Sequence, residues 1–332
     1  MDMCQDSGVF RKVGIKMDKS TATQATLLHR LRLNQHLIGR AQILLSAVGF
    51  GAIGLLAKSA YQSGLNAPSL LTLRFVLAAI ILWLYFLLFN REAIRIGRKE
   101  FAICAILGLA GYVVFSSLVF KAFESTPASV VTILFFSYPV FVMFLGWAVM
   151  RERPALQFWL GALLILSGLS VGVSRSLMSE MSVGCLLAVG GAAWYAAYLV
   201  AAHRLLNKVK PQTVALYVIS FAAVSFWLIH GTTVTQLSAL PISAWVAVGL
   251  LALFSTVMAL LLFFAGLQRI GAAEASQLGT IELILSLIFA AVGLSEPISA
   301  PLVLGAGLIL IGILISQVNL GIRRQECLSE KN

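Results

Sequence analysis

Long apolar runs recur along the chain and are separated by short polar or charged stretches. Each run is close to the roughly 20 residues that a helix needs to cross a hydrocarbon core about 30 Å thick. The pattern predicts ten membrane-spanning helices, at residues 41–61, 69–89, 101–121, 128–149, 157–174, 183–202, 212–230, 244–266, 272–294 and 299–318. The expected fold class is therefore an all-α integral membrane protein.

Composition agrees with a membrane protein. Of the 332 residues, 60% are hydrophobic and only 11% are charged, and the mean hydropathy of +0.95 lies far outside the range of a soluble domain. The net charge of +11 would suit a nucleic-acid partner if the basic residues formed one continuous face. They are scattered between the apolar runs instead, so the lipid bilayer is an expected partner and nucleic acid is not.

Lys and Arg residues are concentrated on one side of the predicted membrane. If the N-terminal tail, residues 1–39, is cytoplasmic, the segments on its side together with Arg40 hold 20 of the 24 Lys and Arg residues. The opposite loops hold only Lys121 and Arg175. Because Lys and Arg mark cytoplasmic loops, this tail and the C-terminal tail, residues 321–332, are both predicted to be cytoplasmic. The expected location is the cell (inner) membrane.

An internal repeat becomes visible when the chain is compared with itself at a shift of 144 residues. The shift superposes Glu152 on Glu296, Gly161 on Gly305, Gly168 on Gly312, and AFESTPASVV on GLQRIGAAEA. Residues 40–175 and 182–320 are therefore predicted to be two related units of five helices each. Since five is odd, the second unit would enter the membrane upside down relative to the first, and such inverted repeats are typical of secondary transporters.

Several short motifs mark the first half in a fixed order, and part of the same pattern recurs in the second half. They are Lys58, Pro68, Arg74, TPAS, Pro139 and RERP with Gly161 and Gly168 in the first half, and GAAEAS, LSEP, Gly305 and Gly312 in the second. In order, spacing and duplication, residues 40–320 resemble the EamA-type branch of the drug/metabolite transporter superfamily. The resemblance implies a ten-helix carrier, often an exporter of amino acids or other small metabolites, driven by an ion or proton gradient.

The resemblance also implies partners and one local feature. A small-molecule substrate and a proton or another ion would bind, a homodimer is left open, and no cofactor is expected. The family usually has a proline after the glutamate of its ninth helix, whereas Leu283 follows Glu282 here. Pro139 is available for a kink in the fourth helix, and the equivalent position of the ninth helix lacks the proline.

Glu282 stands inside a long apolar run, QLGTIELILSLIFAAVGLSE, where hydrocarbon cannot solvate a charge. It comes about ten residues into its predicted helix, roughly 15 Å deep in the membrane. Small and polar residues share its face and predict that it points into the protein: Ala275, Gly279, Ser286, Ala290 and Gly293. Burial disfavours a charged carboxylate, so Glu282 could bind and release a proton near neutral pH. The alternative is a structural glutamate that is protonated or ion-paired.

Two basic residues also fall within predicted spans. Arg74 lies about five residues into its helix, roughly 7 to 8 Å below the outer end, where its planar fork could bind a substrate carboxylate or phosphate. An arginine that snorkels outward or holds a structural ion pair is the alternative. Lys58 follows Ser46, Phe50 and Gly54 at steps of four, which places it on a stripe expected to face the bundle. A lysine near the outer end can also snorkel.

Aromatic residues suggest the walls of a central cavity. In the sixth span, a glycine, Trp194 and Tyr198 share one helical face, where the rings could line a cavity. Phe50 is the repeat-equivalent of Trp194 and would line the opposite wall. Tyr138 is the repeat-equivalent of Glu282. Ordinary helix packing through small residues is the alternative reading of this pattern.

Other classes of function lack their sequence signatures. The chain has no HExxH zinc motif and no GxxxxGK[ST] phosphate loop, so neither a zinc enzyme nor an ATP-driven pump is indicated. The four cysteines show no metal-ligand spacing, so no metal site is expected. A channel fits less well, because inverted repeats with buried charges suit alternating access better than a fixed pore. The sequence therefore predicts a secondary active transporter, with a membrane-embedded enzyme or a channel as the alternative.

Overall fold

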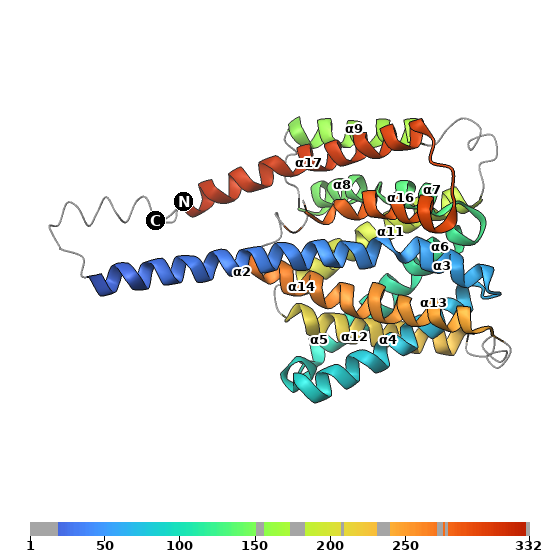
Figure 1. Ribbon diagram of the computed structural model, residues 1–332, viewed down its shortest axis with the longest axis horizontal. Helices are drawn as coiled ribbons and strands as arrows, with labels where there is room; N and C mark the ends of the chain where they lie inside the picture. Colours follow the sequence, from blue (N-terminus) through green and yellow to red (C-terminus); the bar gives the residue numbers. More distant parts are fainter. Residues whose placement is uncertain are drawn as a thin grey trace.

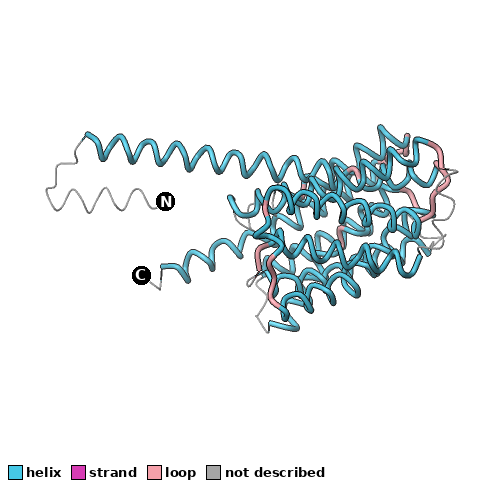
Figure 2. The backbone as a smooth tube through the Cα atoms, turned by 90° about the horizontal axis from the view of Figure 1, so that it is seen from below, coloured by secondary structure: helices cyan, strands magenta, loops and turns pink. Residues whose placement is uncertain are grey.

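The computed structural model describes residues 19–150, 156–172, 183–206, 209–230, 240–270, 275 and 278–329. Within this part of the chain, the regular structure is helical and contains no strand. Figures 1 and 2 show one elongated helical bundle, from which α2 (Lys19–Gly51) and α17 (Ala300–Ser329) project at the same end.

The remaining helices follow one another along the bundle. They are α3 (Ile53–Gln62), α4 (Ala67–Phe89), α5 (Arg98–Ile106), α6 (Val113–Ser125), α7 (Ala128–Phe135), α8 (Tyr138–Met150), α9 (Leu156–Gly172), α11 (Val183–Leu206), α12 (Pro211–His230), α13 (Ile242–Ala252), α14 (Ala259–Ile270) and α16 (Ile281–Leu294). Three short segments complete the path: the 3-10 turn η1 (Arg91–Ile94) and the π-helical segments η2 (Leu107–Tyr112) and η4 (Leu253–Met258).

Many of these helices are suited to a membrane. Seven are long and apolar enough to cross one: Gln35–Gln62, Ala67–Phe89, Arg98–Ser125, Ala128–Leu145, Val183–Ala202, Pro211–His230 and Ile242–Ile270. Three shorter apolar helices, Trp159–Gly172, Ile281–Leu294 and Ala300–Ser316, fall on the other predicted spans. The prediction of an all-α protein with multiple membrane-spanning helices is confirmed, and the count of ten spans stays a prediction.

Helices from the two halves of the sequence pack on each other. α2 packs on α14 and α16, and α11 packs on α6, α7 and α8. α4 runs along α12, and α9 runs along α17. Each of these contacts joins a helix of residues 40–175 to a helix of residues 182–320, so the halves share one continuous apolar core.

Glycines bring α9 and α17 into close contact. A Cβ atom added at Gly161 would lie 2.7 Å from the Gly312 carbonyl oxygen, and one added at Gly168 would lie 2.5 Å from the Gly305 carbonyl oxygen. Only glycine permits this approach of two backbones. The shift of 144 residues superposes Gly161 on Gly305 and Gly168 on Gly312. When the two halves are exchanged, the contact of Gly161 with Gly312 therefore becomes the contact of Gly305 with Gly168, and the reverse.

Several helical paths are interrupted partway along their length. The path through α7 and α8 is broken after Phe136, whose φ and ψ are −69° and 7°. The path into α16 is broken at Thr280, with φ −62° and ψ −18°, and the path through α2 and α3 at Ala52, with φ −76° and ψ −7°. Such local departures from regular α-helix are frequent at functional sites.

Candidate functional site

Glu282 lies in the first turn of α16, directly after the interruption at Thr280. Its side chain is partly exposed, while Ser286 and Ala290 on the same face are buried. A Cβ atom added at Gly51 would lie 3.3 Å from the Glu282 carbonyl oxygen. The backbone of α2 therefore reaches α16 at the level of Glu282, which places this carboxyl among packed helices.

Two tyrosines lie near the Glu282 carboxyl. The hydroxyl groups of Tyr138, in the first turn of α8, and Tyr195, in α11, lie within electrostatic range of it. Their ring centroids are 5.2 Å apart. Among the described residues, no Lys or Arg forms an ion pair with Glu282 and no group donates a hydrogen bond to it. A carboxyl near two hydroxyl groups can bind a proton.

Tyr138 and Tyr195 belong to a larger group of aromatic rings, the tyrosine cluster. Its members are Tyr112, Phe115, Phe135, Tyr138, Tyr195 and Tyr198. The ring centroids of Tyr195 and Phe115 are 4.8 Å apart, and those of Phe115 and Tyr112 are 4.7 Å apart. All six side chains are partly exposed rather than fully buried. The cluster presents both ring faces and hydroxyl groups, which suits contact with an amphipathic ligand.

Arg74 lies at the other end of this cluster. Its guanidinium is 5.1 Å above the Phe75 ring, and the Phe75 centroid is 5.4 Å from that of Tyr112. The residue is only 3% exposed, and its Nε donates a hydrogen bond of 2.8 Å to Thr256 Oγ1 in η4. No carboxylate of the described residues forms an ion pair with it. A buried guanidinium that has no carboxylate partner among the described residues can bind an anionic group.

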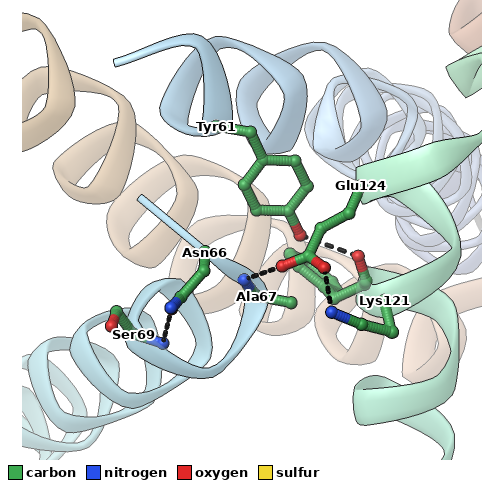
Figure 3. A network of polar contacts seen from close by, with 7 residues as sticks. Tyr61, Asn66, Ala67, Ser69, Lys121 and Glu124 are labelled. Carbon is green, nitrogen blue, oxygen red and sulfur yellow. Dashed lines mark hydrogen bonds and ion pairs between the residues drawn. The ribbon is translucent and has the colours of Figure 1, made fainter. Parts of the chain in front are cut away.

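A polar network fixes the start of the helix that carries Arg74 (Figure 3). The Asn66 side chain accepts a hydrogen bond of 3.0 Å from the Ser69 N–H, which caps α4. Glu124 accepts a hydrogen bond from the Ala67 N–H and pairs with Lys121. These contacts hold the first turn of α4 in place, and Arg74 lies further along the same helix.

Three of the predicted site residues lie outside the tyrosine cluster. Phe50 contacts the Phe263 ring of α14 edge-on, at a centroid distance of 6.3 Å. Trp194 is 44% exposed, and its Nε1 donates a hydrogen bond of 2.9 Å to the Ala110 carbonyl. Lys58 in α3 is partly exposed and lies within electrostatic range of Glu296. The structure brings together the other four residues of the predicted set, Glu282, Tyr138, Tyr198 and Arg74, along the cluster.

The sequence pattern did not single out Tyr112, Tyr195 or Thr256. Tyr112 and Thr256 both lie next to Arg74, and the shift of 144 residues superposes one on the other. A comparison of the two halves at this shift could therefore have pointed to Tyr112 and Thr256 as equivalent positions. For Tyr195, the signal was its spacing of three residues from Tyr198, which puts both rings on one side of α11.

Some other features of the molecule do not form a site. The segment GLSVG at residues 168–172 matches the GxSxG pattern of serine hydrolases, but Ser170 lies inside α9 and donates a hydrogen bond of 2.9 Å to the Leu166 carbonyl. The pattern requires a strand-to-helix turn, which α9 does not provide. No group of three or more metal-ligating side chains occurs in the described part of the chain.

A groove between α4 and α12 also differs from the candidate site. It measures about 550 Å³ and is lined mainly by apolar side chains, among them Ile80, Leu84, Trp227 and Leu228. These four residues are exposed, so the groove opens toward the side of the bundle. Its one polar contact is already satisfied, because Trp83 Nε1 donates to Ser220 Oγ at 2.9 Å.

Comparison with known proteins gives a consistent result. The model of the EamA-like transporter family matches residues 37–173 and again residues 182–317. The uncharacterized transporter YcbK of Bacillus subtilis (strain 168) is 27% identical over 288 residues, which cover 83% of this chain and 91% of YcbK. The uncharacterized transporter YyaM of the same organism is 27% identical over 277 residues, covering 80% of this chain and 88% of YyaM.

Among the solved structures that are similar in fold, one covers most of this chain. It is described only as a crystal structure of a protein, and it matches with a TM-score of 0.60 over 88% of this chain and 99% of its own. The sequence identity is 24%, so the likeness concerns the fold alone.

Proposed function

The chain belongs to the EamA-like transporter family, and on that premise we propose that it is a secondary active transporter that exports small metabolites or amino acids by alternating access. The names of its relatives support transport. A proton gradient is the proposed source of energy, because Glu282 is a carboxyl that can bind and release a proton among packed helices.

The proposed architecture has ten spans arranged as two inverted repeats, residues 40–175 and 182–320. The exchanged glycine contacts of α9 and α17 support it, since a two-fold relation produces contacts of this reciprocal kind. Both termini are proposed to be cytoplasmic in the cell membrane. A cysteine placed at Ser63 and one placed at Gln325 are then expected to react with an impermeant reagent from opposite sides. Labelling of both from the same side would contradict the proposed topology.

In the proposed cycle, Glu282 couples transport to the proton gradient. A proton from one side of the membrane binds the carboxylate, and the resulting carboxylic acid releases that proton to the other side after the cavity has changed its facing. The nearby hydroxyl groups of Tyr138 and Tyr195 offer hydrogen-bonding partners during the exchange. The guanidinium of Arg74 binds the carboxylate or phosphate of the substrate at the other end of the tyrosine cluster.

The observation that carries this proposal is the position of Glu282 in the first turn after a helix interruption, near two tyrosines and without an ion pair to any described residue. Discontinuous helices that meet near the middle of the bilayer form the substrate and ion sites of many secondary transporters. A carboxyl needed only for packing would be expected to have a fixed polar partner.

Transport is tested in two steps. Comparing the metabolites inside and outside cells that contain or lack the protein identifies a substrate. Flux of that substrate in proteoliposomes is then expected to saturate and to accelerate when unlabelled substrate is present on the opposite side. A flux that rises without saturation would indicate a channel, and chemical conversion of the substrate would indicate an enzyme.

A further inference from the structure

One carboxylate joins distant parts of the chain at one end of the bundle. Glu296 lies in the connection between α16 and α17 and accepts hydrogen bonds from the Ala128 N–H (2.7 Å), the Ser129 N–H (3.0 Å) and the Ser129 hydroxyl (2.6 Å). These donors all belong to the first turn of α7. The Glu296 N–H in turn donates to the Ala290 carbonyl of α16 at 3.2 Å, which ties the carboxylate to that helix.

The start of α7 depends on this contact. Its N-cap residue, Pro127, makes no side-chain cap hydrogen bond, so the first N–H groups of the helix need acceptors from another element. An anion at this position is also favoured by the helix dipole. Ala128 and Ser129 are 2% and 3% exposed, so water competes little for these groups. The three hydrogen bonds of Glu296 therefore form a strong, directional contact.

The same contact bridges two groups of helices. α16 packs on α2 and α3, and α7 packs on α11; the two groups meet where α7 packs directly on α16 and contacts α3. Alternating access requires two such groups to separate at one end of the bundle while they stay together at the other. Lys58 of α3 lies within electrostatic range of Glu296 and adds a positive charge on the side of α16.

We propose that Glu296 is a latch: its three hydrogen bonds to α7 hold this end of the bundle closed, and they break whenever the transporter opens toward that side. The inference rests on the proposed alternating-access mechanism and adds a residue that controls which facing is populated. It concerns the end of the bundle and not the binding of substrate or proton at Glu282.

Glu124 provides a matched control. Its carboxylate also accepts a hydrogen bond from a backbone N–H at a helix start, that of Ala67 in α4. Glu124 and Ala67 both belong to the first half of the chain. Glu124 lies in α6, and α4, which begins at Ala67, packs directly on α6. Separation of α7 from α16 would leave this contact intact. Loss of the Glu124 carboxylate is therefore expected to remove a helix cap without releasing the proposed latch.

The test measures the distance across this end of the bundle. Nitroxide labels are attached to cysteines placed at Ser125 and Ser299, which are both exposed and lie on the two sides of the proposed latch. The four native cysteines are first replaced in the full-length chain, and distances are measured by double electron–electron resonance in lipid nanodiscs without substrate. The variants compared are Glu296→Gln, Ser129→Ala and Glu124→Gln, each checked for folding by gel filtration.

Glu296→Gln is expected to raise the ratio of separated to joined ends by at least about tenfold, or about 1.4 kcal/mol. Ser129→Ala removes one of the three donors and is expected to give a smaller shift in the same direction. If Glu296→Gln does not fold, the distances in Ser129→Ala test the latch instead. An unchanged distance distribution in the folded latch variants, or an equal shift in Glu124→Gln, would overturn the latch. Because no substrate is present, a negative result here leaves the transport assay as a separate test of the proposed function.

Discussion

The fourth and ninth predicted spans are interrupted at equivalent positions, yet they differ in chemistry there. In the fourth, α7 ends at Phe135 and α8 begins at Tyr138. In the ninth, α16 begins at Ile281, directly after Thr280. The shift of 144 residues superposes Tyr138 on Glu282, so the first turn after one interruption carries a phenol and the other a carboxyl.

The two interruptions also differ in the residue that follows. Pro139 follows Tyr138, and because proline has no N–H it cannot donate to the carbonyl four residues earlier, which permits an irregular turn there. Leu283 follows Glu282 and retains its N–H, which donates to the Thr280 carbonyl at 3.2 Å in a tight turn. A proline is therefore not required for the interruption, and the packing of the surrounding helices must contribute to its position.

The chemical difference suggests that the two equivalent positions have different roles. A tyrosine hydroxyl stays neutral across the physiological pH range, whereas a carboxyl can lose or gain a proton within it when its environment disfavours the charge. Under the proposed mechanism, the position on α16 carries the proton and the equivalent position on α8 does not. The equivalent position on α8, Tyr138, supplies a ring and a hydroxyl.

Replacing the titratable group, Glu282, is expected to have the largest effect on transport. Glu282→Gln keeps the size and the hydrogen-bonding capacity of the side chain and removes titration. Gradient-driven accumulation in proteoliposomes is expected to fall to the level of empty liposomes, while downhill exchange of substrate persists. Tyr138→Phe, the matched change at the equivalent position of the fourth span, is expected to slow exchange and to retain accumulation. Normal accumulation by folded Glu282→Gln would end the coupling hypothesis.

Arg74→Lys is expected to have the next largest effect, at the end of the tyrosine cluster away from Glu282. Lysine keeps the charge but loses the planar fork, the contact of Nε with Thr256 and part of the stacking on Phe75. The exchange rate is expected to fall at least about tenfold, which corresponds to about 1.4 kcal/mol of transition-state stabilisation.

The same substitution at an exposed arginine, Arg98→Lys, controls for the change of side chain. It is expected to leave the exchange rate unchanged. If folded Arg74→Lys exchanged substrate as fast as Arg98→Lys, Arg74 would be a structural residue and would bind no substrate anion.

Pro139→Ala is expected to have the smallest effect. If the surrounding packing fixes the interruption, as it does in the ninth span where Leu283 stands in place of the proline, the exchange rate should change by no more than about threefold, or roughly 0.7 kcal/mol. The thermal unfolding temperature and the exchange rate of the variant are measured together. A large loss of both would show that the interruption of the fourth span depends on its proline, unlike that of the ninth.

The helical membrane fold could be predicted because many apolar runs of spanning length in one chain are rare outside helical membrane proteins. The internal repeat added the correspondence between Tyr138 and Glu282, which the structure places close together. Arg74 and Glu282 were recognisable for a related reason, since a charged residue inside an apolar run is costly and therefore noticeable.

Other parts of the site could not be predicted from local patterns. A spacing of four residues places Trp194 and Tyr198 on one helical face, but it does not fix how α11 is rotated against its neighbours. The packing of α11 on α6 directs Tyr195 and Tyr198 into the cluster and leaves Trp194 44% exposed. Glu296 belongs to the motif LSEP, and its partners on α7 lie far away in the sequence, so only the fold brings them together.

The central claim, that Glu282 carries the transported proton, is tested most directly by measuring proton movement itself. Proteoliposomes that contain a pH-sensitive dye are given an outward or inward gradient of substrate with no initial pH difference. The account predicts that substrate flux through the wild-type protein moves protons across the membrane, and that Glu282→Gln moves substrate without any change in internal pH. Proton movement that persists in Glu282→Gln, in proportion to its substrate flux, would contradict the claim.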